Sequence, residues 1–290
     1  MCGTGGYDPA DTDWNEVWKA RMARHDATKN FHDPSHNWDN KENAERYYRS
    51  SQGEFDARVN QTIAGLKLSR EYRVLDIGSG PGTLAIPLSP LVKEVTALDS
   101  SEGMLAILRD HADRAGIQNI RTVHGLWEEI DPVRDLAGPY DIIISSLALT
   151  MFDLKSALRK MNDACSGYVA VYWFADMPFW ERNNAGLWEQ LHGSPYYPSP
   201  KADCVFGVLC QMGLFPDVTM LPLDKTYRFG NLSEALAYFA PKFGVKTPQQ
   251  EAILREYISR FIRADGNGVI LSGDSLHAKI VWHARQGYSI

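Results

Sequence analysis

The chain has 290 residues, of which 44% are hydrophobic and 23% charged, with a formal net charge of −6. These totals predict a globular protein with one large core, or a core and a smaller lobe. The negative charge excludes a general attraction to nucleic acid or anionic membranes. The first six residues lack the basic and apolar regions of a signal peptide, and no apolar run is long enough to span a bilayer. We therefore expect a cytoplasmic protein without a membrane partner.

Cysteine and histidine spacing gives no indication of a metal site. The four cysteines, Cys2, Cys165, Cys204 and Cys210, are scattered without a C-x-x-C pair, which favours reduced thiols. His32 and His36 are four residues apart, but Pro34 between them argues against the helix that would bring them together. We expect two loop histidines and no metal.

Helical patterns precede the first strand. Asp13 and Glu16 form a capping-box pattern, followed by an apolar helical face of Trp14, Val17, Trp18 and Met22. A second helical stretch begins near Glu42 and continues into the core domain. We interpret residues 1–54 as an N-terminal helical lid.

The stretch from Val74 to Thr83 is the strongest local signal. Val74, Leu75 and Ile77 suit a short buried parallel strand, and the glycines after it allow a sharp turn close to a ligand. Thr83 then begins a helix whose free N–H groups face back toward that ligand. Pro87 and Pro90 predict that this helix is kinked or short.

The glycine spacing restricts the class of ligand that is expected. Gly78, Gly80 and Gly82 follow Asp76 as D-x-G-x-G-x-G, which differs from the G-x-G-x-x-G of dinucleotide sites. A carboxylate at the strand end would repel a pyrophosphate, but it suits an ammonium or sulfonium group. A second predicted strand, 92–98, ends at Asp99, where an acid can accept hydrogen bonds from ribose hydroxyls.

This pattern resembles the first motif of class I S-adenosylmethionine (SAM) methyltransferases of the type 11-like family. The segment from Asp99 through Ser101 to Met104 and Leu105 resembles the family's D-x-S-x-x-M-L. The resemblance implies an α/β fold with a Rossmann-like, doubly wound, seven-stranded and mostly parallel sheet whose last strand, 276–283, is antiparallel. It also implies SAM as cofactor and S-adenosylhomocysteine (SAH) as product.

The cofactor residues implied by the resemblance lie on the glycine loop and at the ends of the next strands. Related enzymes commonly carry Asp where this chain has Leu126, so Trp127 is a candidate to stack on the adenine or line the pocket, with simple packing as the alternative. The full set is Asp76, Gly78, Ser79, Gly80, Gly82, Thr83, Asp99, Ser100, Met104, Gly125, Leu126, Trp127, Ser145 and Ser146.

We divide one catalytic domain into the lid, a SAM-binding core of residues 55–176, a lid insertion of residues 177–200 and a C-terminal part of residues 201–290. Aromatic residues in the insertion suggest a pocket for a partly apolar small molecule or, equally, a packed lid. His192 and Asp176 are the candidates for a general base.

The function predicted from the sequence is transfer of a methyl group from SAM to an O, N or S atom of a small molecule. Methyltransferases acting on DNA or release factors usually carry Asn-Pro-Pro-Tyr where this chain has Ser145-Ser146-Leu147-Ala148, which disfavours those substrates. The alternatives are methylation of tRNA or protein, or a non-catalytic SAM-sensing module. A nicotinamide dehydrogenase is disfavoured by the glycine spacing and by Asp76. The oligomeric state does not follow from the sequence.

Overall fold

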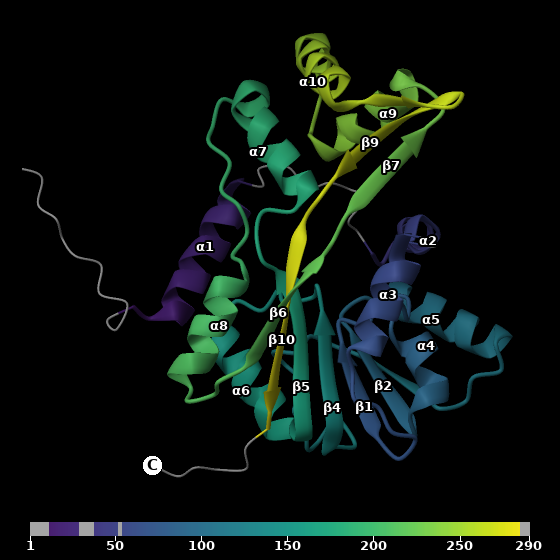
Figure 1. Ribbon diagram of the computed structural model, residues 1–290, viewed down its shortest axis with the longest axis vertical. Helices are drawn as coiled ribbons and strands as arrows, with labels where there is room; N and C mark the ends of the chain where they lie inside the picture. The colour runs from purple at the N-terminus through teal and green to yellow at the C-terminus, as the bar shows by residue number, and fades with distance from the viewer. Residues whose placement is uncertain (1–11, 29–37, 52–53, 285–290) are drawn as a thin grey trace, which may run out of the picture.

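A seven-stranded sheet forms the centre of the protein. The computed structural model describes residues 12–28, 38–51 and 54–284. The strand order is β3-β2-β1-β4-β5-β10-β6, and β10 runs antiparallel to both of its neighbours (Figure 1). The strands are β1 Arg73–Ile77, β2 Glu94–Asp99, β3 Ile120–His124, β4 Tyr140–Ser146, β5 Cys165–Phe174, β6 Asp217–Pro222 and β10 Leu276–His283. The predicted sheet with its antiparallel last strand is confirmed.

Helices cover both faces of this sheet, so β1, β4 and β5 are almost wholly buried, as expected for parallel strands. One face packs on α3 Glu54–Ala64, α4 Ala85–Leu88 and α5 Glu102–Arg114, and the other on α1 Trp14–Thr28, α6 Leu154–Ala164 and α8 Ala202–Gln211. Because of its prolines, α4 has only four residues before a 3₁₀ turn, as the sequence predicts. None of the helices in the described ranges is both long and apolar enough to cross a membrane.

The N-terminal helices separate onto different parts of the molecule. The α1 helix packs against α8 and α6, with the Trp18 indole N–H donating to the carbonyl oxygen of Met151 at 2.9 Å. The α2 helix, Lys41–Ser51, packs instead on α5 next to the carboxyl ends of β1 and β2. Asp13 caps α1 by accepting from the N–H of Glu16, as its position in the sequence suggests.

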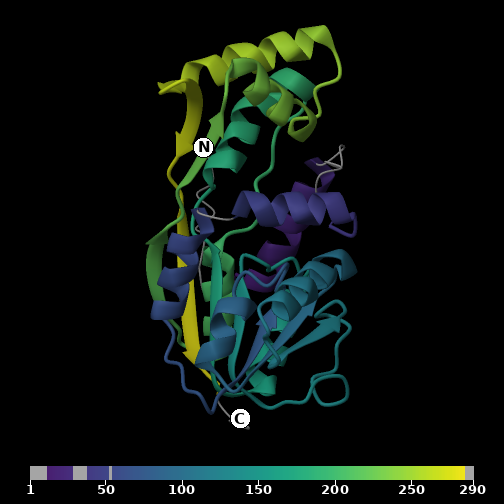
Figure 2. The ribbon, with the colours of Figure 1, turned by 90° about the vertical axis from the view of Figure 1, so that its right-hand side faces the viewer.

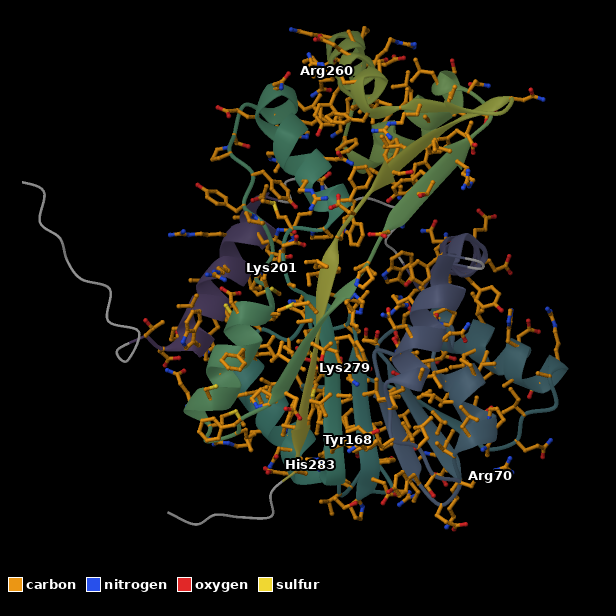
Figure 3. All side chains as sticks on the ribbon, in the orientation of Figure 1. Arg70, Tyr168, Lys201, Arg260, Lys279 and His283 are labelled. Atoms are coloured by element: carbon orange, nitrogen blue, oxygen red, sulfur yellow. The ribbon has the colours of Figure 1, made fainter. Side chains whose placement is uncertain are left out.

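Side chains of the sheet fix the position of α3. The Tyr172 hydroxyl donates to the carbonyl oxygen of Thr62 at 3.5 Å, and the Lys279 ammonium donates to that of Gly65. Tyr168 accepts from the N–H of Lys67 at 3.0 Å. These contacts satisfy groups at the end of α3 that the helix itself leaves unpaired. Figure 3 shows Lys279 above Tyr168 along the sheet.

A cleft of about 410 Å³ opens beside this contact, lined by Lys67, Tyr168, Lys279 and His283 among others. His283 ends β10 and lies beside the amino end of β5, so this cleft is at the edge of the sheet opposite to the glycine loop (Figure 3).

A second lobe stands above the carboxyl edge of the sheet (Figures 1 and 2). Its apolar core joins Phe179 and Leu187 to Phe239, Leu254 and Leu271. Its elements are α7 Phe179–His192, β7 Lys225–Phe229, α9 Leu232–Lys242, α10 Pro248–Phe261, β8 Arg263–Asp265 and β9 Gly268–Gly273, with strand order β7-β9-β8. Two of these three short strands, β7 and β9, continue β6 and β10 beyond the main sheet, and β8 pairs with β9.

The contact between α1 and α8 gives a testable prediction. A Cβ atom at Gly207 would lie 2.3 Å from the Trp14 ring, inside van der Waals contact. Gly207→Ala should therefore displace Trp14 and lower the free energy of unfolding by about 1–3 kcal/mol. Urea denaturation measures this change. In a Trp14→Ala background the same substitution should cost much less, and an equal cost in both backgrounds would contradict the packing interpretation.

Candidate cofactor and active site

The glycine loop leaves β1 at the carboxyl edge of the sheet. Gly78, Gly80 and Gly82 all have positive φ, at 73°, 54° and 86°. A Cβ at Gly78 would lie 2.3 Å from the Cβ of Ala148, and one at Gly82 would lie 2.9 Å from Leu108. A Cβ at Gly80 would have no protein atom within 4 Å. The first and third glycines are thus required by packing, whereas the middle one faces the open space that a ligand can use.

Asp99 organises this loop from the end of β2. Its Oδ2 accepts from the N–H of Gly80 at 2.7 Å, and its Oδ1 accepts from the N–H of Ser101 at 2.9 Å. Burial raises the pKa of Asp99, although these two N–H groups favour the ionised form. Each carboxylate oxygen keeps acceptor capacity for a further donor. Asp99 can therefore hold the loop and receive ribose hydroxyls together.

Asp76 is 2% exposed, and its Oδ2 has no hydrogen-bond partner among the described residues. Burial first, and the neighbouring charge of Asp99 second, raise its pKa to about 7, while Arg58 opposes the rise. A buried carboxyl with an unpaired oxygen is costly unless a ligand completes it. An ammonium group would supply both the missing donors and the missing charge.

Arg58 is a site residue that the sequence analysis did not identify. It comes from α3, and its Nη1 donates to the Ser146 hydroxyl at 3.0 Å. Burial lowers the pKa of its guanidinium, and the ionised forms of Tyr47 and Asp76 act against this. An arginine on a helix next to a glycine motif has no local signature, because only the docking of α3 brings it to the sheet edge.

Two further predicted residues have orphaned hydroxyls. Ser79 is 5% exposed and Ser145 is 0% exposed, and neither Oγ has a partner among the described residues. Together with Asp76, they place three unsatisfied buried polar side chains around the loop and the end of β4. Such a concentration at one edge indicates a ligand site, because buried polar groups are normally hydrogen-bonded.

The environment of Trp127 differs from the one expected for a residue that stacks on the adenine. This residue is 2% exposed, belongs to the core cluster and donates from its indole N–H to the carbonyl oxygen of Ala157 at 3.2 Å. It packs the loop onto α6, so the interpretation as an adenine-stacking residue is corrected to packing. Lys160 donates to the carbonyl oxygens of Trp127, Glu128 and Ile130 and fixes the same loop. Leu126, 46% exposed, is the side chain left at the surface.

The other predicted cofactor residues lie near these groups. Ser101 caps α5 by accepting from the N–H of Met104, and Met104 packs with Ala44 of α2. The Gly125 N–H donates to the carbonyl oxygen of Asp99, which joins the β3 loop to the end of β2. Ser100 and Thr83 complete the two turns, where both are partly or largely exposed.

The two candidate bases are not equally placed. His192 ends α7 in the second lobe, where its Nε2 lies 3.0 Å from the carbonyl oxygen of Phe243, so one ring nitrogen is used within the lobe and a role as base stays a prediction. Asp176 follows β5 at the carboxyl edge, but it is half exposed and lies 4.0 Å from Arg182. It also accepts from the N–H of Leu276 at 3.4 Å.

No group of three or more His, Cys, Asp or Glu side chains in the described part of the chain is arranged to hold a metal ion. The two histidines considered above, at positions 32 and 36, lie outside the described residues.

Comparison with known proteins agrees with this geometry. Residues 74–166 match the model of a methyltransferase domain family. Residues 74–166 therefore form a methyltransferase domain. An uncharacterised protein of Haemophilus influenzae is 30% identical over 152 residues, 52% of this chain and 53% of the relative. The uncharacterised methyltransferase YcgJ of Bacillus subtilis is 35% identical over 92 residues, 31% of this chain and 35% of the relative.

The structural comparison supports the fold. The crystal structure of YcgJ superposes with a TM-score of 0.54 at 21% identity, covering 79% of this chain and 98% of YcgJ. The alignments to the two sequence relatives span about half and one third of their lengths. The residues present would fit SAM: Asp76 would suit its ammonium, Asp99 its ribose, and the space beside Gly80 the body of the ligand.

The buried carboxyl of Asp76 is predicted to lower the stability of the free protein and to increase its affinity for SAM. Between its ordinary value near 3.8 and about 7, the folded protein holds a proton that the unfolded chain has released. Its stability should therefore fall as the pH rises through that window. The Asp76→Asn side chain cannot ionise. At pH 8 and without ligand, the free energy of unfolding of this variant should therefore be roughly 2–4 kcal/mol higher than that of the wild type.

The same substitution should abolish most of the stabilisation that SAM provides, because a neutral amide cannot pair with an ammonium. Urea unfolding at pH 5 and pH 8, with and without SAM, measures both effects. Asp224→Asn, at an exposed position, is the control. A variant that is less stable than the wild type at pH 8 would contradict the assigned pKa.

Proposed function

We propose that this protein transfers a methyl group from SAM to a small molecule and works in the cytoplasm. The observation that carries the proposal is a pair of opposite charges at the carboxyl edge. Asp76 and Arg58 are both largely buried and lie within electrostatic range of each other. They complement the ammonium and the carboxylate of an amino-acid end, which a nicotinamide dinucleotide does not have.

Bound SAM supplies a methyl group that is already activated by its sulfonium. The protein's own part is to hold the amino-acid end at β1, hold the ribose at β2 and exclude water. Arg58 bonded to Ser146 places α3 over the end of β4, and Tyr47 of α2 lies within electrostatic range of both Arg58 and Asp99. Two helices thus cover the site from one side.

A small acceptor is favoured by this cover and by the overall charge. The second lobe stands over the same edge, and the net charge of −6 offers no general attraction to RNA. Matched relatives include a ubiquinone biosynthesis O-methyltransferase of Ruegeria, 40% identical over 68 residues, and a release factor glutamine methyltransferase of Bordetella pertussis, 40% identical over 76 residues. Relatives are thus named for small-molecule and for protein acceptors. The helices and the lobe over the site favour a small-molecule acceptor for this protein.

Thermal unfolding tests the cofactor. SAM or SAH at ~100 times its dissociation constant should add about 2.7 kcal/mol to the stability, and NAD should add nothing. Asp99→Asn replaces one acceptor oxygen by a donor, which weakens both the hydrogen bonds to the loop and acceptance from the ribose, so the shift with SAM should shrink. Stabilisation by NAD and not by SAH would overturn the proposal. SAM binding without formation of SAH in the presence of any small-molecule acceptor would indicate a sensor.

The assignment of Arg58 predicts a ligand-dependent defect. Arg58→Met should weaken binding of SAH by about 10- to 100-fold, because a charged hydrogen bond of roughly 1.5–3 kcal/mol is lost. It should leave 5′-methylthioadenosine, which lacks the amino-acid end, bound as in the wild type. Isothermal titration measures both ligands.

Arg114→Met is the matched control, since Arg114 is exposed on α5 and pairs with Asp110. Equal losses for both ligands would mean that Arg58 only supports the fold of the edge.

A further inference from the structure

His277 is a buried titratable residue that the cofactor does not use. It is 1% exposed, and its Nδ1 has no hydrogen-bond partner among the described residues. It is the second residue of β10, and because β10 is antiparallel, this places it at the carboxyl edge of the sheet, opposite Phe174 at the end of β5. The ring of Tyr172 lies 6.0 Å away between centroids.

The position of His277 separates it from the cofactor groups. The strand order β1-β4-β5-β10 puts three intervals between Asp76 and His277. At roughly 4.8 Å for each interval this is about 14 Å, too far for one ammonium group to reach both side chains. If Asp76 and Asp99 hold SAM at the ends of β1 and β2, the space over β5 and β10 lies on the far side of β4 from these groups. A ligand bound there would be in a position to be the methyl acceptor.

His277 is unprotonated at neutral pH. Burial, and then the positive charge of Arg58, lower its pKa to about 4. A neutral imidazole accepts a hydrogen bond at Nδ1 in one tautomer and donates one there in the other. A hydroxyl group can complete Nδ1 in either tautomer, because it both donates and accepts. Since an ammonium would lie near the Arg58 guanidinium in a buried site, a neutral hydroxyl is the better match.

Aromatic side chains extend from His277 toward the second lobe. Phe174 is the residue directly opposite His277 in the sheet, and its ring lies 5.6 Å from that of Trp180 at the start of α7. Both are only partly buried, so they retain surface for a ligand. Edge-to-face and offset-stacked contacts with these rings favour an acceptor that contains an aromatic ring.

We propose that the methyl acceptor is a phenol whose ring lies against Phe174 and Trp180 and whose hydroxyl donates to Nδ1 of His277. This rests on the proposed methyltransferase function. In the reaction, the phenol oxygen forms a bond to the methyl carbon while the carbon–sulfur bond breaks and its electron pair stays on sulfur. The phenol proton becomes strongly acidic as the new bond forms and passes to Nδ1, from which it is lost to water.

The test uses three probes that share a naphthalene ring: 2-naphthol, 2-naphthylmethylamine and 2-naphthoate, each with radiolabelled SAM. We expect 2-naphthol to be methylated and the other two not. His277→Leu should lower kcat/KM for 2-naphthol by about 10²- to 10⁴-fold, with the affinity for SAM unchanged within twofold. His277→Asn keeps an acceptor atom near the position of Nδ1, and should recover KM more than kcat.

His283→Leu is the control, because His283 lies on the same strand and face at the far end of the sheet (Figure 3). It should retain full activity. Transfer to the amine or carboxylate in preference to 2-naphthol, no transfer to 2-naphthol by protein that binds SAM, or an unchanged rate in His277→Leu would each overturn the proposal. Failure of the wild type to bind SAM would instead overturn the methyltransferase function on which it rests.

A second measurement does not depend on the variants folding. In wild-type protein saturated with SAH, the ¹⁵N signal of the unprotonated Nδ1 of His277 should move upfield when 2-naphthol is added. It should not move with 2-methoxynaphthalene, which has no O–H to donate. Equal shifts with both compounds, or no shift with either, would overturn the hydrogen bond to His277.

Discussion

A carboxyl group buried near the carboxyl end of β1 is the constraint on which the site depends. Asp76 is surrounded by protein, lies near a second carboxylate and lacks a donor for one oxygen. The arrangement costs stability in the free protein, and only Arg58 among its named neighbours reduces that cost. A zwitterionic ligand would reverse the balance, because its ammonium would complete Asp76 and its carboxylate would pair with the charge of Arg58. In the proposed function, part of the affinity for the cofactor thus comes from a carboxyl group whose oxygen has no partner among the described residues.

The position of Arg58 depends on contacts at the other end of its helix. Tyr172, Lys279 and the Tyr168 hydroxyl bind main-chain groups at or just beyond the end of α3, and these contacts set its angle on the sheet. The charged end of α3 then reaches Ser146 at the end of β4. Binding at the carboxyl edge is therefore linked to packing near the middle and the opposite end of the same sheet face.

The last strand links the cofactor domain to the second lobe. β9 and β10 follow each other with only two residues between them, as do β6 and β7, so two nearly continuous strand pairs rise from the main sheet into the lobe (Figure 1). His277 and Phe174 lie where this rise begins. Trp180 at the start of α7 consequently lies close to Phe174 at the end of β5, and the proposed acceptor region is bounded by both units.

The glycine loop and the two acids follow from the sequence, because each depends on neighbours within about ten residues. The seven-stranded sheet was expected from the resemblance to a known family, because strand order depends on long-range pairing. Gly78, Gly80 and Gly82 need positive φ wherever the chain folds, and Asp76 and Asp99 each sit at the end of an apolar run. Tertiary structure alone decided the rest. No local sequence pattern marks Arg58 or His277 as a site residue. Trp127 is a packing residue because its indole N–H donates to the Ala157 carbonyl oxygen of α6, and His192 lies in the second lobe against the Phe243 carbonyl oxygen. Long-range docking determines which side of a residue remains open to a ligand, and a single sequence does not encode that locally.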